Sequence, residues 1–565
     1  MEIRNFAALI LLLLSVSAIA APPPPDLILF HGDFFTSDAA HPRAEALAVS
    51  ADRILAVGTT AAMLKLAGPH TRRLDLGGRV VVPGFNDSHN HLMIMPEHLT
   101  LALDGMDAPW PQVKEKLAAM AASAPHGALI VGATGPTLLA ERGANRTALD
   151  LLAPNNPVIL ATWTQHSVIL NSAALKLLEV KEDEPNPQGG TWERGADGKL
   201  TGRAFDFARF RLHRRLAEAT PEALALQETR EFLDEAIRHG ITTEQEMSEP
   251  ASPGMLLQLF TKAPTPIRIR IMRYLLTDKV GAMDEGRELP RNPTPLITVS
   301  GTKWILDGTP IEHSAALRQP YADAPGTSGA LNFPAKEVEV MLRKALRDGD
   351  QPIFHCVGDR AAETLFDAMD ATGGAKVWST RRVRVEHGDG VVPALALRAK
   401  ALGVIVTENP THFGLELHDL ILRRLGAERA SQFFAFRSLL DGGIRLGIAS
   451  DGGANPFVDL MFATTDPSRP SEAVTREQAV IAYTLTAAYA EFAEKNKGSL
   501  EAGKLADLAV LSQDIFQVPA EKLPQTESVL TMVGGKIVYR AKAVFPLLLA
   551  GAGARSVSNV HPPRL

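Results

Sequence analysis

From about residue 220 onward, short β-branched runs alternate with segments of helical hydrophobic spacing, and this rhythm constrains the fold most. With one earlier run, 80–91, the strands are expected at 240–243, 267–272, 295–307, 352–355, 383–387, 403–407 and 444–450. Eight strands separated by helices predict an α/β fold, a (β/α)8 barrel of the TIM type. A doubly wound open sheet is the alternative, but it gives no reason for polar residues at so many strand ends.

The two ends of the chain have a different pattern, of short alternating segments broken by Gly and Asp. Such segments occur at 26–31, 46–51, 53–58, 507–511 and 529–538, with Gly534-Gly535 as a hairpin turn. They predict one small β-sandwich domain formed by residues 22–80 and 496–545. The barrel would then occupy residues 81–495.

The stretch 96–220 follows the first expected barrel strand and is much longer than an ordinary connection. It contains its own helical segment at 110–122 and a turn-rich part at 185–202. We interpret it as a large inserted subdomain that overhangs the barrel mouth. Residues 546–565 form a C-terminal tail to which the pattern assigns no function.

The N-terminus has the features of a secretory signal peptide: Arg4, an apolar run 7–19 and small residues before Ala21. We expect residues 1–21 to be removed and the protein to be exported, periplasmic or secreted from a bacterium, with no stable membrane association after cleavage. A retained membrane anchor is the alternative. Cys356 is the one cysteine, so no intrachain disulfide can form.

The net charge of the chain indicates which kinds of molecule it can bind. The net charge is −6 and no long Lys/Arg run occurs, which argues against nucleic acid as a partner. A small-molecule substrate is the expected partner, and an oligomer is left open.

Two histidines close the first expected strand. Side chains alternate faces along a strand, so His89 and His91 point the same way and can bind one ion together. A solvent-exposed pair would have the same spacing.

Active sites of barrels lie at the carboxyl ends of the strands, and other strands here end in polar residues too. These are Lys303, His355, His387 and Asp451. Imidazole and carboxylate ligands suit a divalent ion such as zinc.

Several motifs together resemble the amidohydrolase superfamily. They are Pro83 to His91, Lys303 to Gly308, His355 to Ala361, Glu386-His387 and Ala449 to Asp451. Trp163 to Leu175 and Pro320 to Asp323 are similar to the YtcJ-like amidohydrolase branch, which includes N-substituted formamide deformylases. The resemblance covers roughly residues 26–539. It is specific for the superfamily and not for a substrate.

The resemblance implies one or two divalent metal ions. His89 and His91 would hold one ion with Asp451, while His355 and His387 would hold a second. Lys303 matches a position at which many members carry a carboxylated lysine that bridges two metals. The alternative is a plain cation that pairs with Asp307 or with an acidic substrate group, because an ammonium has no lone pair for a metal.

The implied chemistry is attack of a metal-activated water on a carbonyl. Asp451 would take the proton of that water and pass it to the leaving nitrogen. His166, in the segment that begins at Trp163, would hydrogen-bond the substrate or the developing oxyanion; its alternative is a cap within the insertion.

Three further residues are expected to contact the substrate: Trp163, His412 and Glu408. Glu408 departs from the family pattern and would add a negative charge at the pocket edge.

These observations predict a metal-dependent hydrolase that cleaves a C–N bond of amide, N-acyl or N-formyl type in a small molecule. A deaminase or an esterase on the same metal site is the first alternative. A noncatalytic binding protein on a decayed barrel is the second, and the complete ligand set argues against it.

Overall fold

The computed structural model describes residues 23–283 and 285–541. The signal peptide expected at 1–21 and the tail at 546–565 therefore lie outside the described residues. Within the described part, no helix is both long and apolar enough to cross a membrane.

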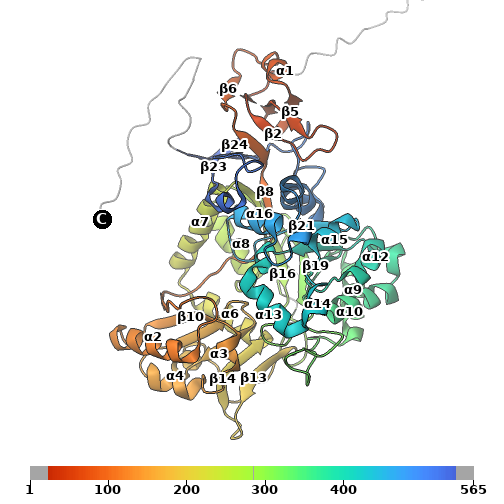
Figure 1. Cartoon of the computed structure of the whole chain (residues 1–565). Coiled ribbons are helices and arrows are strands. Elements are labelled where there is room, and N and C mark those ends of the chain that lie inside the picture. Colours follow the sequence, from red (N-terminus) through yellow and green to blue (C-terminus); the bar gives the residue numbers. More distant parts are fainter. Residues whose placement is uncertain (1–22, 284, 542–565) are drawn as a thin grey trace, which may run out of the picture.

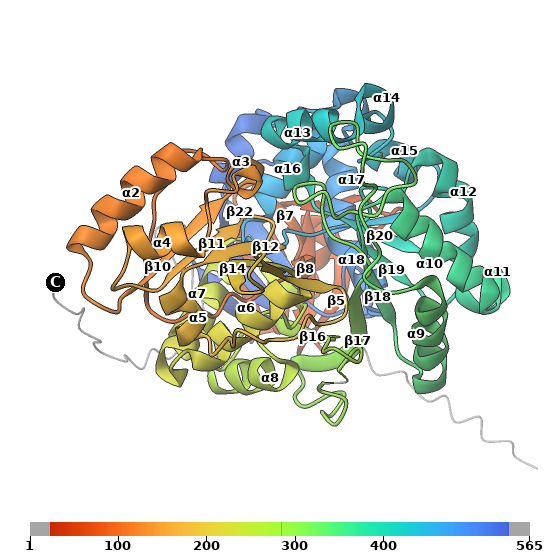
Figure 2. The ribbon, with the colours of Figure 1, turned by 90° about the horizontal axis from the view of Figure 1, so that it is seen from below.

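The centre of the molecule is a sheet of eight parallel strands in the order β21-β20-β19-β18-β17-β16-β15-β8 (Figures 1 and 2). Its two edge strands meet at one end, where the Asp451 amide donates to the His89 carbonyl at 2.9 Å. The predicted TIM-type barrel is thus confirmed. The strands are β8 (Phe85–Asn90), β15 (Ile241–Glu246), β16 (Arg268–Tyr274), β17 (Ile297–Ile305), β18 (Pro352–Cys356), β19 (Arg384–His387), β20 (Ile405–Glu408) and β21 (Arg445–Ile448).

Amphipathic helices surround these strands, as the view from below shows for α8, α9, α10 and α12 (Figure 2). In α9 the residues Val338, Met341, Leu342 and Ala345 are buried, a spacing that places them on one face, and Gly349 ends the helix in the left-handed conformation (φ 62°). The helices are α7 (Glu222–Arg238), α8 (Pro253–Lys262), α9 (Ala335–Asp348), α10 (Asp359–Ala371), α11 (Gly374–Trp378), α12 (Pro393–Leu402), α13 (Leu415–Leu425), α14 (Ala427–Ala430), α15 (Phe436–Asp441), α16 (Pro456–Thr465), α17 (Arg476–Ile481) and α18 (Ala487–Ala490), with short helical turns η1 (Pro410–Phe413), η2 (Pro470–Glu472) and η3 (Ala482–Thr486).

Strands from both chain ends form two sheets at the top of Figure 1, in the orders β5-β4-β1-β6 and β24-β23-β22-β7-β2-β3. Ala509 of β22 pairs with Val82 of β7, so the two ends of the chain are hydrogen-bonded to each other, as predicted for the small β domain. The elements are β1 (Leu27–Phe30), β2 (Asp33–Phe35), β3 (Arg43–Ala44), β4 (Ala46–Ser50), β5 (Arg53–Gly58), α1 (Thr60–Leu64), β6 (Arg72–Asp75), β7 (Val80–Pro83), β22 (Leu508–Leu511), η4 (Ala520–Gln525), β23 (Ser528–Val533) and β24 (Lys536–Arg540).

One boundary differs from the prediction. The run 80–91 is not a single barrel strand, because Val80–Pro83 (β7) belongs to a sheet of the small β domain and the first barrel strand begins at Phe85. Gly84 separates the two strands, and a Cβ at this position would lie only 2.1 Å from Thr242 Oγ1. Glycine therefore allows the close passage from one sheet to the other.

The insertion forms a lobe with its own six-stranded sheet, in the order β13-β14-β12-β11-β10-β9. It lies at the end of the barrel opposite the small β domain (Figure 1). Its elements are β9 (His98–Thr100), α2 (Trp110–Ser123), β10 (Leu129–Thr134), α3 (Pro136–Ala140), α4 (Arg146–Leu152), β11 (Val158–Thr162), β12 (Ser167–Leu170), α5 (Ser172–Leu177), β13 (Gly190–Arg194), β14 (Leu200–Asp206) and α6 (Phe207–Ala219).

Candidate metal centre

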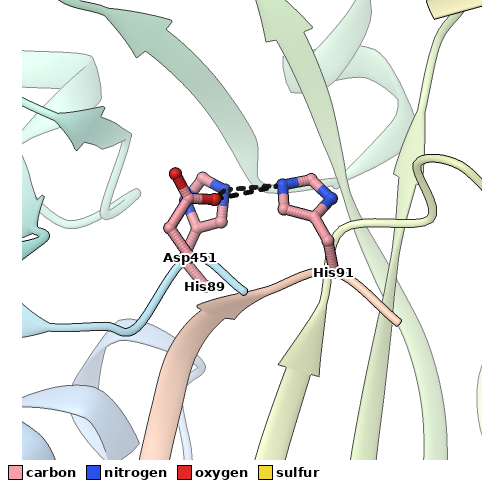
Figure 3. Close-up of side chains that lie close together, drawn as sticks. All are labelled: His89, His91 and Asp451. Carbon is pink, nitrogen blue, oxygen red and sulfur yellow. Dashed lines mark hydrogen bonds and ion pairs between the residues drawn. The ribbon is translucent and has the colours of Figure 1, made fainter. Parts of the chain in front are cut away.

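His89, His91 and Asp451 converge where the first and last barrel strands meet (Figure 3). The Nε2 atoms of the two histidines are 3.1 Å apart, and Asp451 Oδ1 lies 3.4 Å from each of them. Two imidazole nitrogens that face each other at this distance need a proton or a cation between them. The donor set, two imidazoles and one carboxylate, fits a divalent metal.

Three predicted ligands come from neighbouring strands: Lys303 on β17, His355 on β18 and His387 on β19. All three are buried. The ring centre of His387 lies 5.1 Å from that of His89 and 4.6 Å from that of His355. The structure therefore brings the predicted metal residues of four barrel strands together with Asp451.

The Nδ1 atoms of His89, His91 and His387 each have a hydrogen-bond acceptor, whereas that of His355 has none among the described residues. His89 Nδ1 lies 2.7 Å from Glu386 Oε2, and His91 Nδ1 lies 2.6 Å from the Glu249 carbonyl. His387 Nδ1 lies 2.8 Å from Asn409 Oδ1. Such acceptors fix the proton on Nδ1, which leaves the lone pair of Nε2 for a metal.

Burial and neighbouring charges shift the pKa values of these groups. Burial lowers the pKa of His89, His355 and His387 well below the ordinary value, so these imidazoles are neutral. Burial also acts on His91, but the hydrogen bond and charge of Asp451 outweigh it and raise the pKa of His91 to about 9. For Asp451 burial opposes ionisation, yet the two histidines hold its pKa well below the usual range. Asp451 is therefore an anion.

Lys303 lies among the histidines, and burial lowers the pKa of its amine to about 8. In the described part of the chain it makes no ion pair within 4.0 Å. The alternative pairing with Asp307 is wrong, because that carboxylate accepts hydrogen bonds from the backbone amides of residues 316, 357 and 358.

The metal residues open into a cavity of about 690 Å³. Its surface is mostly apolar, and Trp163, Phe210, Ile305 and Phe434 are among the lining residues. Residues of the insertion thus contribute part of the cavity wall. This composition is typical of a small-molecule site.

His166 and His412 also line this cavity. His166 Nδ1 lies 2.7 Å from Asp206 Oδ1, and its ring centre is 5.1 Å from that of His355. The ring centre of His412 lies 5.8 Å from that of His387. The structure therefore places Trp163, His166 and His412 on the wall of this cavity.

Glu408 does not lie at the cavity edge, and the predicted negative charge there is wrong. The side chain is fully buried and is not part of the cavity wall. Burial, reinforced by the charge of Asp389, raises the pKa of Glu408 well above its ordinary value. Burial thus favours the neutral form of this carboxyl group, and the side chain is not on the cavity wall.

The sequence interpretation assigned no role to two groups that support the histidines. Glu386 was visible only as the neighbour of His387, and strand alternation could have shown that the two side chains diverge. Asp206 carried no signal, because it lies far from His166 in the chain and meets it through the pairing of β12 with β14.

A parallel strand–helix barrel with imidazoles and a carboxylate gathered at one end is an arrangement that can bind a divalent metal at an active site. The sequence profile of the amidohydrolase family matches residues 72–539. The chain therefore belongs to the amidohydrolase family, and the resemblance found in the motifs is confirmed.

Relatives match over almost the whole chain. The N-substituted formamide deformylase of Arthrobacter pascens is 27% identical, over 91% of this chain and 98% of the relative. Protein LONG AFTER FAR-RED 3 of Arabidopsis thaliana is 28% identical, over 91% of both chains. An uncharacterized metal-dependent hydrolase from Pyrococcus horikoshii has the same fold, with a TM-score of 0.66, 21% identity and coverage of 88% of this chain and 99% of the other.

Proposed function

We propose that this hydrolase cleaves a C–N bond of amide type, including N-acyl and N-formyl groups, in a small molecule. The observation that carries the proposal is the convergence of His89, His91 and Asp451 on the wall of a largely apolar cavity. The name of the Arthrobacter relative supports the choice of bond. One or two divalent ions, with zinc as the expected metal, would be held by the predicted ligands.

A divalent ion in this position supplies a Lewis acid that polarises a carbonyl and lowers the pKa of water. Asp451 then moves the proton. Because Asp451 Oδ1 faces His89 and His91, Oδ2 is the atom that accepts a proton from the attacking water and delivers it to the leaving nitrogen.

His166 orients the substrate. Its Nδ1 is held by Asp206, so Nε2 is the polar atom left to hydrogen-bond the substrate. Its ring packs at 82° against Phe210, which restricts its rotation. Trp163 lines the same cavity and offers an apolar surface to the part of the substrate that does not react.

Lys303 is suited to carboxylation. At a pKa of about 8, an appreciable fraction of the amine is neutral near pH 7 to 8. A neutral amine can form a carbamate with carbon dioxide, and the resulting anion has lone pairs for a metal that an ammonium lacks.

A matched substrate series tests the reaction. Chelator-treated protein is reloaded with Zn²⁺ and assayed on the N-formyl and N-acetyl derivatives of one arylamine, on the corresponding ester and on a ring amine. We expect turnover of the amides only in the loaded protein. Faster turnover of the ester or the ring amine would replace the proposal by an esterase or a deaminase. Bound metal without turnover of any of them would indicate a binding protein.

We also propose export, on the basis of the N-terminal pattern alone. Expression in a bacterium, followed by fractionation and mass measurement, should give a periplasmic or secreted protein that begins near residue 22. A full-length protein retained in the membrane would indicate an anchor instead.

A further inference from the structure

A second cavity lies at the end of the barrel that carries the small β domain. Its volume is about 1490 Å³, and it is bounded by the first residues of β16 and β17, by the segment before β18 and by the hairpin of β23 and β24. The metal residues, by contrast, come from the carboxyl ends of the barrel strands, on the side of the insertion (Figure 1). The two cavities are therefore separate sites at opposite ends of the barrel.

Positive side chains outnumber negative ones on the wall of this second cavity. Seven Lys and Arg residues line it against three Asp and Glu residues, although the chain as a whole has a net charge of −6. Two of the seven are paired, Arg268 with Asp507 and Lys497 with Glu491. The other five have no carboxylate within 4.0 Å among the described residues: Arg53, Arg270, Arg291, Arg381 and Lys536.

Arg270 is the buried member of this group, with 3% of its surface exposed. Its guanidinium donates only to neutral oxygens: Nε to Ser300 Oγ at 3.0 Å, Nη1 to Gln245 Oε1 at 3.3 Å and Nη2 to Gln351 Oε1 at 2.7 Å. Gln245 Oε1 also accepts from Arg384 Nη1 at 2.7 Å, so a second guanidinium lies close to the first. Burial and this like charge lower the pKa of Arg270 to about 10.

The charge of Arg384 is compensated within the protein, whereas that of Arg270 is not. Arg384 Nε and Nη2 lie 2.8 Å and 3.0 Å from the carboxylate oxygens of Glu386. A buried cation without a counter-charge is unfavourable, and an anion that enters the cavity would supply the counter-charge of Arg270. Its three hydrogen bonds use three of the five N–H groups of the guanidinium, so donors remain for an oxyanion.

Two exposed arginines of the same cavity, Arg291 and Arg381, lie in loops that adjoin Arg270. The Arg291 carbonyl accepts a hydrogen bond of 2.9 Å from the β17 backbone, one residue before Ser300. The carbonyl of the residue after Arg381 accepts a hydrogen bond of 2.7 Å from the Gln351 side chain. Both loops are thus attached to partners of Arg270, and their cations attract an anion toward it.

We propose that the second cavity binds a small oxyanion, a phosphate monoester or a dicarboxylate, on Arg270, and that Arg291 and Arg381 attract this ligand at the rim. Phosphate and carboxylate oxygens share the chemistry that a guanidinium recognises. Binding at this site is independent of the bond that the metal centre cleaves, and it is measured without a substrate of that reaction.

Titration calorimetry on the full, metal-loaded chain measures the affinity for inorganic phosphate and for succinate, with NaCl holding the ionic strength constant. We expect binding of at least one of them. Tighter binding of phosphate would identify a phosphate-bearing ligand, and tighter binding of succinate a dicarboxylate. The affinity should fall about 10- to 100-fold in Arg270→Gln and about 3- to 10-fold in Arg291→Gln/Arg381→Gln. Arg72→Gln/Arg73→Gln, which removes two exposed arginines of β6 outside the cavity, is the matched control and should bind as the wild type does.

Absence of binding of both anions at millimolar concentration would overturn the proposal. So would wild-type affinity in either folded variant, because an anion bound at the metal centre would be unaffected by these substitutions. If Arg270→Gln unfolds at a lower temperature than the wild type, modification of the wild type by phenylglyoxal replaces this variant. Slower modification of Arg291 and Arg381 in the presence of the anion, with Arg72 and Arg73 unchanged, supports the proposal. Equal rates with the anion and with NaCl overturn it.

Discussion

Replacing Glu386 by glutamine removes one buried charge with little change in shape. Glu386 Oε2 lies 2.7 Å from His89 Nδ1, and the two carboxylate oxygens lie 2.8 Å and 3.0 Å from the Nε and Nη2 atoms of Arg384. These three side chains are almost completely buried. Glu386 thus has two separable tasks: it fixes the metal-facing nitrogen of His89, and it neutralises a cation that has no access to water.

Loss of each of these two interactions has an effect of its own size. Leaving one member of a buried ion pair without its partner costs about 3–5 kcal/mol of unfolding free energy. Loss of the carboxylate behind a metal-binding histidine weakens metal affinity about 10- to 100-fold. We therefore expect Glu386→Gln to lose both stability in urea and affinity for Zn²⁺.

The double variant Arg384→Met/Glu386→Gln separates the two effects. Removing both charges should restore most of the stability, because buried ion pairs can be replaced by apolar groups of similar volume. The weakened Zn²⁺ affinity should remain, since His89 still lacks its carboxylate. Urea unfolding of metal-free protein and chelator competition measure the two quantities. Wild-type affinity in the double variant would refute the role assigned to Glu386 at the metal centre.

Three further outcomes are expected. Asp451→Asn should lower kcat about 10²- to 10⁴-fold through loss of the proton acceptor while metal remains bound; full turnover would remove Asp451 from the mechanism. Asp206→Asn should lower kcat and change its pH profile, because His166 loses its orientation, and an unchanged profile would make Asp206 merely structural. In metal-free protein, the raised pKa of His91 stabilises the fold fully below pH 6.5, and this contribution is lost as pH rises through about 9. The stability advantage of the wild type over His91→Gln should therefore shrink across this range in urea unfolding at several pH values, and a constant difference would contradict the shift.

The barrel was predictable because its strands are buried on both faces and therefore consist of short apolar runs. The ligands were predictable because they follow those runs directly. By contrast, Val80–Pro83 has the same apolar pattern but pairs with β22, near the other end of the chain, and no local signal identifies a distant partner.

Glu408 shows a different limit. A carboxylate at the end of a strand is normally expected to face water, yet this side chain is buried and its pKa is raised well above the ordinary value. The direction of the Glu408 side chain depends on the backbone conformation at the end of β20, which the sequence pattern does not show. The pairing of His166 with Asp206 likewise depends on tertiary contacts that sequence spacing does not encode.

The passage from β7 through Gly84 into β8 has a consequence for the order of events during synthesis. A growing chain that has reached residue 300 already carries His89 and His91, but it lacks Asp451 and the strand β22 that pairs with β7. At that stage β7 can pair with β2 but not with β22, and His89 and His91 lack the carboxylate of Asp451 until most of the polypeptide has been made. A product truncated before Asp451 would therefore lack the carboxylate of the candidate metal-binding group.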